Sequence, residues 1–119
     1  MSTLNICNWL GASGKTYLYY IYPWPTTFAD GQHGNYIYAK IVKNNWEPLY
    51  IGEGDLGKHV SKKHRKAQCI TSKGATYVHV RINDDGPERV SESKDLLAKF
   101  VQAYEPFGCN EKPEVLKEK

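Results

Sequence analysis

The stretch GNYIYAKIVKNNWEPLYIG, residues 34–52, decides the fold of this chain. Residues 35–42 alternate in side-chain type, so the two tyrosines and the lysine share one face of a strand while the isoleucines and the alanine share the other. Residues 43–48 (KNNWEP) have the polar and proline content of a turn, and residues 49–52 (LYIG) return to β-forming side chains. The stretch therefore predicts an antiparallel hairpin with a longer loop.

The segments on either side of this hairpin predict further strands and helices. Residues 16–22 (TYLYYIY) and 75–82 (ATYVHVRI) are rich in tyrosine and β-branched side chains, which favour strands. A first helix is expected over about residues 55–68, opened by an aspartate suited to cap it, and a second over about residues 88–104. Residues 1–14 are interpreted as a polar lead-in. The side chains of the second helix that should face the sheet recur at helical spacing: Val90, Leu97, Phe100, Val101 and Tyr104.

The length of 119 residues and the ordinary hydrophobic content predict one folded domain. We expect an α+β fold, a small central antiparallel sheet flanked by helices, over residues 1–110 with an N-terminal strand extension. Residues 111–119 (EKPEVLKEK) are expected to form a flexible charged tail. No stretch is long and apolar enough to span a membrane, and the N-terminus lacks the layout of a signal peptide, so a cytoplasmic location without membrane contact is expected.

The cysteines predict reduced thiols. Cys7, Cys69 and Cys109 are odd in number and widely spaced, and no two of them form a CxxC pair. This pattern suggests neither a zinc site nor a disulfide framework. Free thiols are therefore expected, in agreement with the expected cytoplasmic location.

Positive charge is concentrated in the middle of the chain. The net charge is only +3, but residues 57–83 contain no aspartate or glutamate. An acid-free basic stretch favours binding of a polyanion, because charges of both signs are usually mixed on a solvated surface. The cations expected to contact nucleic acid are Lys58, Lys62, Lys63, Arg65 and Lys66.

Two short motifs on the predicted hairpin carry a resemblance to a known family. Residues 34–36 (GNY) and 50–52 (YIG) resemble the two halves of the motif of the GIY-YIG nuclease superfamily, in which the halves lie on neighbouring antiparallel strands. A DL pair follows at residues 55–56, residues 74–80 (GATYVHV) look like the middle strand of small bacterial and phage members, and residues 106–110 (PFGCN) look like the closing element. The resemblance implies the fold of that superfamily and metal-dependent cleavage of nucleic acid.

The resemblance also implies roles for individual residues. Gly34 and Gly52 would let a backbone or a phosphate approach the strands closely. Tyr36 and Tyr50 would present hydroxyl groups to a water or a phosphate oxygen at the catalytic centre. His59 stands where family members carry a catalytic arginine, and an imidazole does not reproduce the planar fork of a guanidinium.

The position of the metal-binding glutamate departs from the family pattern. Members hold one divalent metal, usually Mg²⁺, with a glutamate on the second helix. Counting back from the closing element reaches Leu97, and matching the text ESKDLL reaches Ser93, neither of which is such a ligand. Glu92 is the candidate for binding Mg²⁺ in an active enzyme, although one step along a helix turns its side chain about 100° from Ser93. Asn110 keeps the closing asparagine, whose usual role is structural.

Three functions follow from these observations. The first is a GIY-YIG-type protein that binds nucleic acid, DNA rather than RNA, with cleavage lost or impaired and no cofactor. The second is an active Mg²⁺-dependent endonuclease with relocated groups, with His59 or Lys62 at the phosphate and Glu92 at the metal. The third is a small phage-type inhibitor that binds a protein partner through its aromatic surface.

Overall fold

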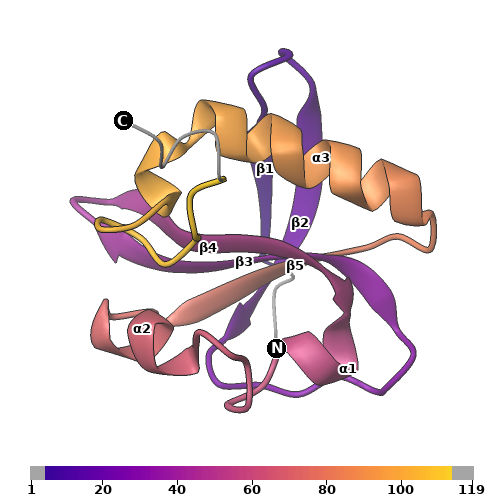
Figure 1. The fold of residues 1–119 in the computed structure, drawn as a ribbon, viewed down its shortest axis with the longest axis horizontal. Coiled ribbons are helices and arrows are strands. Elements are labelled where there is room, and N and C mark those ends of the chain that lie inside the picture. The colour runs from indigo at the N-terminus through magenta and orange to yellow at the C-terminus, as the bar shows by residue number, and fades with distance from the viewer. Residues whose placement is uncertain (1–4, 114–119) are drawn as a thin grey trace.

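A curled antiparallel sheet organises the chain (Figure 1). The computed structural model describes residues 5–113. The sheet order is β1-β2-β5-β3-β4, and all neighbouring strands are antiparallel. The main helix, α3 (Gly86–Lys99), packs against one face, which confirms the predicted α+β class with a central antiparallel sheet. The strands are β1 (Ile6–Leu10), β2 (Thr16–Pro23), β3 (His33–Val42), β4 (Asn45–Asp55) and β5 (Tyr77–Ile82).

The β3–β4 hairpin is the predicted one, but its turn is shorter than expected. Lys43 and Asn44 have positive φ angles of 52° and 67°, so they form a two-residue turn whose twist matches the strands. Residues 45–48, expected in the turn, therefore belong to β4. Pro48 is accommodated because β4 is an edge strand and because the register shifts at a bulge beside it.

The polar lead-in expected at residues 1–14 is wrong in part, because residues 6–10 form strand β1 and pair with β2. Trp9 is 4% exposed, and its indole N–H donates to Nδ1 of His79 on β5, 2.9 Å away. One buried aromatic with a partner far along the chain thus fixes this strand. The local sequence holds too few β-forming residues to indicate it.

Both faces of the sheet are buried, and the predicted alternation along β3 is confirmed. Ile37 and Ala39 face α3 and join Leu96 in one apolar core. Tyr36 and Tyr38 face the opposite side and belong to a second core. The sheet is therefore the middle of three layers. Two short helices cover the tyrosine side: α1 (Leu56–His59) and α2 (Ala67–Ser72).

Helix α3 starts and ends earlier than expected. The Asp85 carboxylate caps it by accepting a hydrogen bond from the backbone N–H of Glu88. The helix ends at Lys99, and the rest of the predicted helix becomes a short 3-10 helix, η1 (Val101–Ala103). Tyr104, expected to be helical, has an extended backbone.

The face that α3 turns towards the sheet is only partly the predicted one. Val90 and Val101 were expected there but are exposed, whereas Leu96 is fully buried. One turn earlier the same face carries Glu92, which forms an ion pair with Arg81. The buried face of α3 therefore includes a charged residue. For this reason, the spacing of apolar residues alone predicts the wrong face of the helix.

The single helix expected over residues 55–68 is wrong, because the chain leaves the helical path between α1 and α2. Its first turn is capped by Asp55 as predicted. Beyond it, Oγ of Ser61 and Nδ1 of His64 each accept a hydrogen bond from the backbone N–H two residues later. These local side-chain bonds replace the helical ones and produce two short helices.

A disulfide joins α2 to the C-terminal segment. Cys69 and Cys109 are bonded across a separation of 40 residues, so the predicted reduced state of these two thiols is wrong. Cys7 is the one free cysteine. Spacing along the chain gives no sign of this pair, because the fold alone brings α2 beside the C-terminal segment.

The C-terminal segment also closes the outer edge of β4. The Asn110 side chain accepts the backbone N–H of Ile51 at 2.9 Å and donates to the carbonyl of the same residue at 3.0 Å. The backbone N–H of Cys109 donates to the carbonyl of Leu49 at 2.7 Å. Asn110 thus has a structural role, because it supplies the hydrogen bonds that a further strand would make.

The expected flexible tail lies only partly within the described residues. Glu111 forms ion pairs with Arg65 and Lys66 at 3.1 and 3.2 Å, so the start of the tail contacts the domain. Residues 114–119 of that tail lie outside the described residues. Within residues 5–113, no helix is long and apolar enough to cross a membrane.

The disulfide should contribute measurably to stability. We expect the double variant Cys69→Ser/Cys109→Ser to lower the free energy of unfolding by about 2–4 kcal/mol, because opening the cross-link frees the unfolded chain. Urea denaturation under non-reducing conditions measures this, with Cys7→Ser as the control variant. Equal stability of the double variant and the control would contradict the assignment of the disulfide.

Candidate functional site

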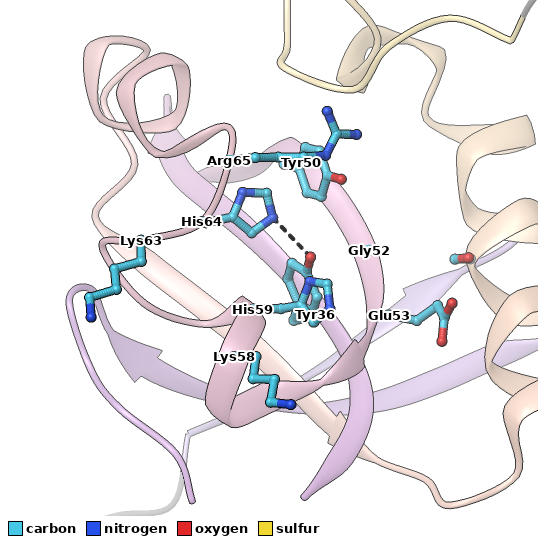
Figure 2. Close-up of a pocket in the computed structure, with 10 residues that line it drawn as sticks. Tyr36, Tyr50, Gly52, Glu53, Lys58, His59, Lys63, His64 and Arg65 are labelled. Carbon is cyan, nitrogen blue, oxygen red and sulfur yellow. Dashed lines mark hydrogen bonds between the residues drawn. The ribbon is translucent and has the colours of Figure 1, made fainter. Parts of the chain in front are cut away.

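A hollow of about 480 Å³ opens beside the β3–β4 hairpin (Figure 2). Its lining comes from the hairpin strands, from residues 58–65 and from α3. It brings together the three residues predicted as catalytic, Tyr36, Tyr50 and His59. The complete lining consists of Tyr36, Tyr50, Gly52, Glu53, Lys58, His59, Lys63, His64, Arg65 and Ser93.

The floor of the hollow is formed by stacked rings. Tyr36 stacks with both Tyr50 and His59, and the ring centroids are 6.0 Å apart in each pair. Tyr36 lies opposite Gly52 across the hairpin, and a Cβ at Gly52 would come within 2.6 Å of the Tyr36 ring. The tyrosine ring by itself therefore requires glycine at this position. Gly34, the other motif glycine, passes directly against a backbone carbonyl of β5.

His64 orients the hydroxyl group of Tyr36 (Figure 2). Nδ1 of His64 accepts the backbone N–H of Lys66 at 2.9 Å, so a neutral ring must carry its proton on Nε2. That Nε2–H donates to the hydroxyl oxygen of Tyr36, 2.9 Å away. Because the Tyr36 oxygen accepts this hydrogen bond, we infer that its own proton can be donated to an acceptor in the hollow, such as an anionic oxygen.

Burial keeps both partners of this hydrogen bond uncharged. It lowers the pKa of His64 to about 4, with smaller contributions from the neighbouring His59, Arg65 and Lys66. It also raises the pKa of the Tyr36 hydroxyl well above its usual value. At neutral pH Tyr36 is therefore a hydrogen-bond donor and not a phenolate base.

Positive side chains form the rim of the hollow. Lys58, Lys63 and Arg65 all line it. Among the ion pairs of residues 5–113, none involves Lys58 or Lys63, and Arg65 pairs with the exposed carboxylate of Glu111. Exposed pairs of this kind are weak, so all three cations are accessible to an anionic ligand.

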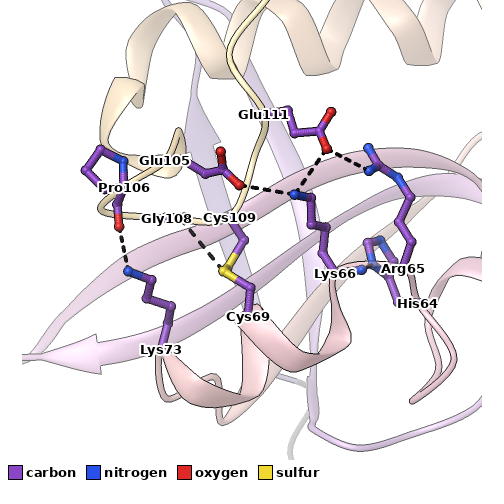
Figure 3. Close-up of polar contacts among 10 residues, drawn as sticks. All are labelled: His64, Arg65, Lys66, Cys69, Lys73, Glu105, Pro106, Gly108, Cys109 and Glu111. Atoms are coloured by element: carbon purple, nitrogen blue, oxygen red, sulfur yellow. Dashed lines mark hydrogen bonds and ion pairs between the residues drawn. A yellow bond between two sulfur atoms is a disulfide. The ribbon is translucent and has the colours of Figure 1, made fainter.

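Two of the cations predicted to bind nucleic acid do not line the hollow. The ammonium group of Lys66 points towards the C-terminal segment, where it pairs with Glu105 and Glu111 (Figure 3). Lys62 lines two neighbouring hollows instead. Some cations of the basic stretch therefore line the hollow, whereas Lys66 forms ion pairs within the protein. They point in different directions because the chain leaves the helical path between α1 and α2.

Carboxylates have little access to the hollow. Glu53 lines it, but its Oε1 accepts a hydrogen bond from Nε of Arg89 at 3.0 Å. Ser93, reached by the ESKDLL match, lines the hollow from α3. Glu92 lines a separate hollow, where its carboxylate lies 3.0 Å from Nε of Arg81.

This set of donors does not fit a divalent metal ion. Mg²⁺ is bound through one or two carboxylates together with further oxygen ligands, and the carboxylate of Glu53 is already paired. Within residues 5–113, no group of three or more His, Cys, Asp or Glu side chains is placed to hold a metal. The position of Glu92 gives no support to the metal-binding role predicted for it.

The role of His64 could not be predicted from the sequence. This residue is 7% exposed although its neighbours Lys62, Lys63 and Arg65 are exposed, and its ring contacts those of Tyr36, Tyr38 and Tyr50. Its burial follows from the break between α1 and α2. A uniform helix over residues 55–68 would not predict that burial.

Comparisons with protein-family models, curated proteins and solved structures returned no match for this chain. What the hollow can do is therefore argued from its geometry. It presents two phenols, two imidazoles and three cations around an open space, with one carboxylate that is already paired. These groups suit an anionic ligand with several oxygen atoms, such as a phosphate.

Acid should destabilise the fold through its buried histidines. Burial lowers the pKa of His64 and of His79 from 6.5 to about 4, so the unfolded chain takes up protons first as the pH falls. The free energy of unfolding should therefore be highest above about pH 6.5 and decline between about pH 6.5 and 4. Urea denaturation across this range measures the slope. His64→Gln should flatten it, and an unchanged slope would contradict the neutral, buried state of His64.

Proposed function

We propose that this chain is a degenerate GIY-YIG-type protein that binds nucleic acid at the hollow and whose phosphodiester cleavage is lost or impaired. The observation that carries the proposal is the composition of the hollow. Tyr36 and Tyr50 form its floor, cations form its rim, and Ser93 lines it from α3, on the helix where the family carries a glutamate.

The arrangement of the motif strands supports the proposal. Residues 34–36 and 50–52 lie on paired antiparallel strands, as the resemblance implies. Strand β5 pairs with the other side of β3, and α1 follows β4 directly. Asn110 of the closing element bonds to Ile51, the central residue of the YIG half. The elements named by the resemblance are therefore in contact with one another.

The donors of the hollow favour an anionic ligand such as a phosphate over an uncharged ligand. Lys58, Lys63 and Arg65 supply charge-assisted hydrogen bonds, and the hydroxyl proton of Tyr36 can join them. Nucleic acid presents phosphates in a row, so exposed lysines outside the hollow can add to the affinity. The acid-free stretch of residues 57–83 keeps this surface positive.

The same donors argue against efficient cleavage. The nuclease family stabilises charge on the phosphate with an arginine, and His59 stands at that position. The family holds a metal with a glutamate on the second helix, and here Ser93 faces the hollow while Glu92 is paired with Arg81 elsewhere. Losing one such electrostatic group typically slows a reaction by about a hundredfold to a thousandfold.

Binding should depend on the rim. We expect Lys58→Glu to weaken binding of a short DNA by about tenfold and to reduce the salt dependence of binding by about one released counterion. Fluorescence anisotropy at several salt concentrations measures both effects. Lys94→Glu is the matched control, because Lys94 is exposed on α3 and does not line the hollow. Equal losses in both variants would indicate a nonspecific effect of net charge.

Cleavage should stay close to background. We expect the wild type to leave plasmid and single-stranded DNA intact with Mg²⁺ or Mn²⁺, because both electrostatic groups of the family are missing. Gel analysis of substrates incubated with the wild type and with Glu92→Ala tests this. Robust cleavage that Glu92→Ala abolishes would support the alternative of an active endonuclease. The absence of both cleavage and binding would favour a protein-binding inhibitor.

A further inference from the structure

Two further hollows extend the candidate site along one side of the molecule. The first, of about 470 Å³, lies between residues 25–27 and residues 61–63. The second, of about 750 Å³, lies between Trp24 and α2. Lys63 lines both the candidate site and the first hollow, and Lys62 lines both further hollows. The three hollows therefore adjoin one another at shared lining residues, and we call the two further ones the side groove.

We propose that the side groove binds the continuation of a single nucleic acid strand whose phosphate is held at the hollow beside Tyr36. In this arrangement Lys63 and Lys62 contact successive phosphates, and an unpaired base lies against Trp24. The inference rests on the proposed function and extends it, because it names single-stranded nucleic acid as the ligand class and assigns a second binding site.

The charge of the side groove suits a polyanion. Its lining contains two lysines and no aspartate or glutamate among the described residues. Lys62 and Lys63 are exposed, and neither takes part in an ion pair within residues 5–113. Lys63 lies on the side of the hollow away from Glu53 (Figure 2). A strand that leaves the hollow past Lys63 thus moves away from the carboxylate and towards further positive charge.

The shape and chemistry of the side groove favour an unpaired strand. Trp24 is half-buried, and its ring packs edge-on against Tyr38 with centroids 4.8 Å apart, so the ring is held in one orientation. A fixed aromatic ring at the wall of a hollow offers a surface on which a base can stack. Only a base that is free of its pairing partner can enter such a hollow. The small hydroxyl side chains along the groove, such as Thr27 and Thr71, can bond to base edges without regard to sequence.

Two lengths of oligonucleotide test the proposal. Fluorescence anisotropy would compare oligothymidines of about 4 and about 12 nucleotides, which cover the site sizes typical of single-strand binders. The groove variant is Lys62→Glu/Thr71→Glu, in which both positions are exposed. The control is Lys94→Glu/Ala98→Glu, which makes the same charge change on the exposed side of α3. We expect the longer strand to bind the wild type at least about tenfold more tightly, and this advantage to fall to about twofold or less in the groove variant alone.

Tryptophan fluorescence gives an independent measurement. Trp9 is buried and Trp46 packs in the core on the other side of the sheet, so quenching by a bound base should come from Trp24. We expect the longer strand to quench the wild type and to have little effect on Trp24→Phe, a substitution that keeps an aromatic ring against Tyr38.

Each outcome separates the inference from the function on which it rests. If Lys58→Glu weakens binding but the groove variant keeps the full length advantage, the side groove is not a strand site, while binding at the hollow stands. If no oligonucleotide binds, both proposals fail. If a polyglutamate peptide of equal charge binds as tightly as the longer strand and loses affinity in the same variants, the groove is a site for acidic protein segments and the inference is overturned.

Discussion

The need to satisfy two buried tyrosine hydroxyls on β3 shapes the whole candidate site. Tyr36 and Tyr38 lie in a strand that is covered on both faces, and an unpaired hydroxyl in such a place is costly. Their partners are Nε2 of His64 and the backbone carbonyl of His59, at 2.9 and 3.0 Å. His59 is the last residue of α1, and His64 lies in the segment that leaves the helical path directly after it. The same turn of the chain that satisfies the tyrosines also places cationic side chains around the hollow.

The contact between α3 and the sheet includes two ion pairs, and these pairs direct neighbouring residues of the helix to different hollows. Arg89 binds Glu53 and Glu92 binds Arg81, each pair at 3.0 Å. These partly buried pairs fix the rotation of the helix, because removing one partner would leave a charge without water or a counterion. With the rotation fixed, Ser93 faces the hollow while Glu92, one position earlier, faces another part of the sheet.

Features of the fold that depend on residues close together in the sequence could be predicted from the sequence. The alternation of residues 35–42 and the cap at Asp55 could be predicted because each depends on near neighbours, whereas the meeting of Tyr36 and Tyr50 was implied by the family resemblance. The strand around Trp9 and the role of His64 could not be, because their partners lie 70 and 28 residues away. Within the candidate site, the tyrosines and part of the cationic rim could be predicted from the sequence. Which cations line the hollow and which form structural ion pairs is known only from the folded chain.

The bond between Cys69 and Cys109 makes the intervening chain a covalent ring that contains β5 and α3. The turn between these two elements contains the exposed Asp84, and exposed loop tips are sites where proteases nick a chain. A cut there would open the ring without separating the two pieces. The N-terminal piece, with the motif hairpin, would stay tethered to the piece that carries α3 and Asn110. The two pieces would migrate together on a denaturing gel until a reductant was added.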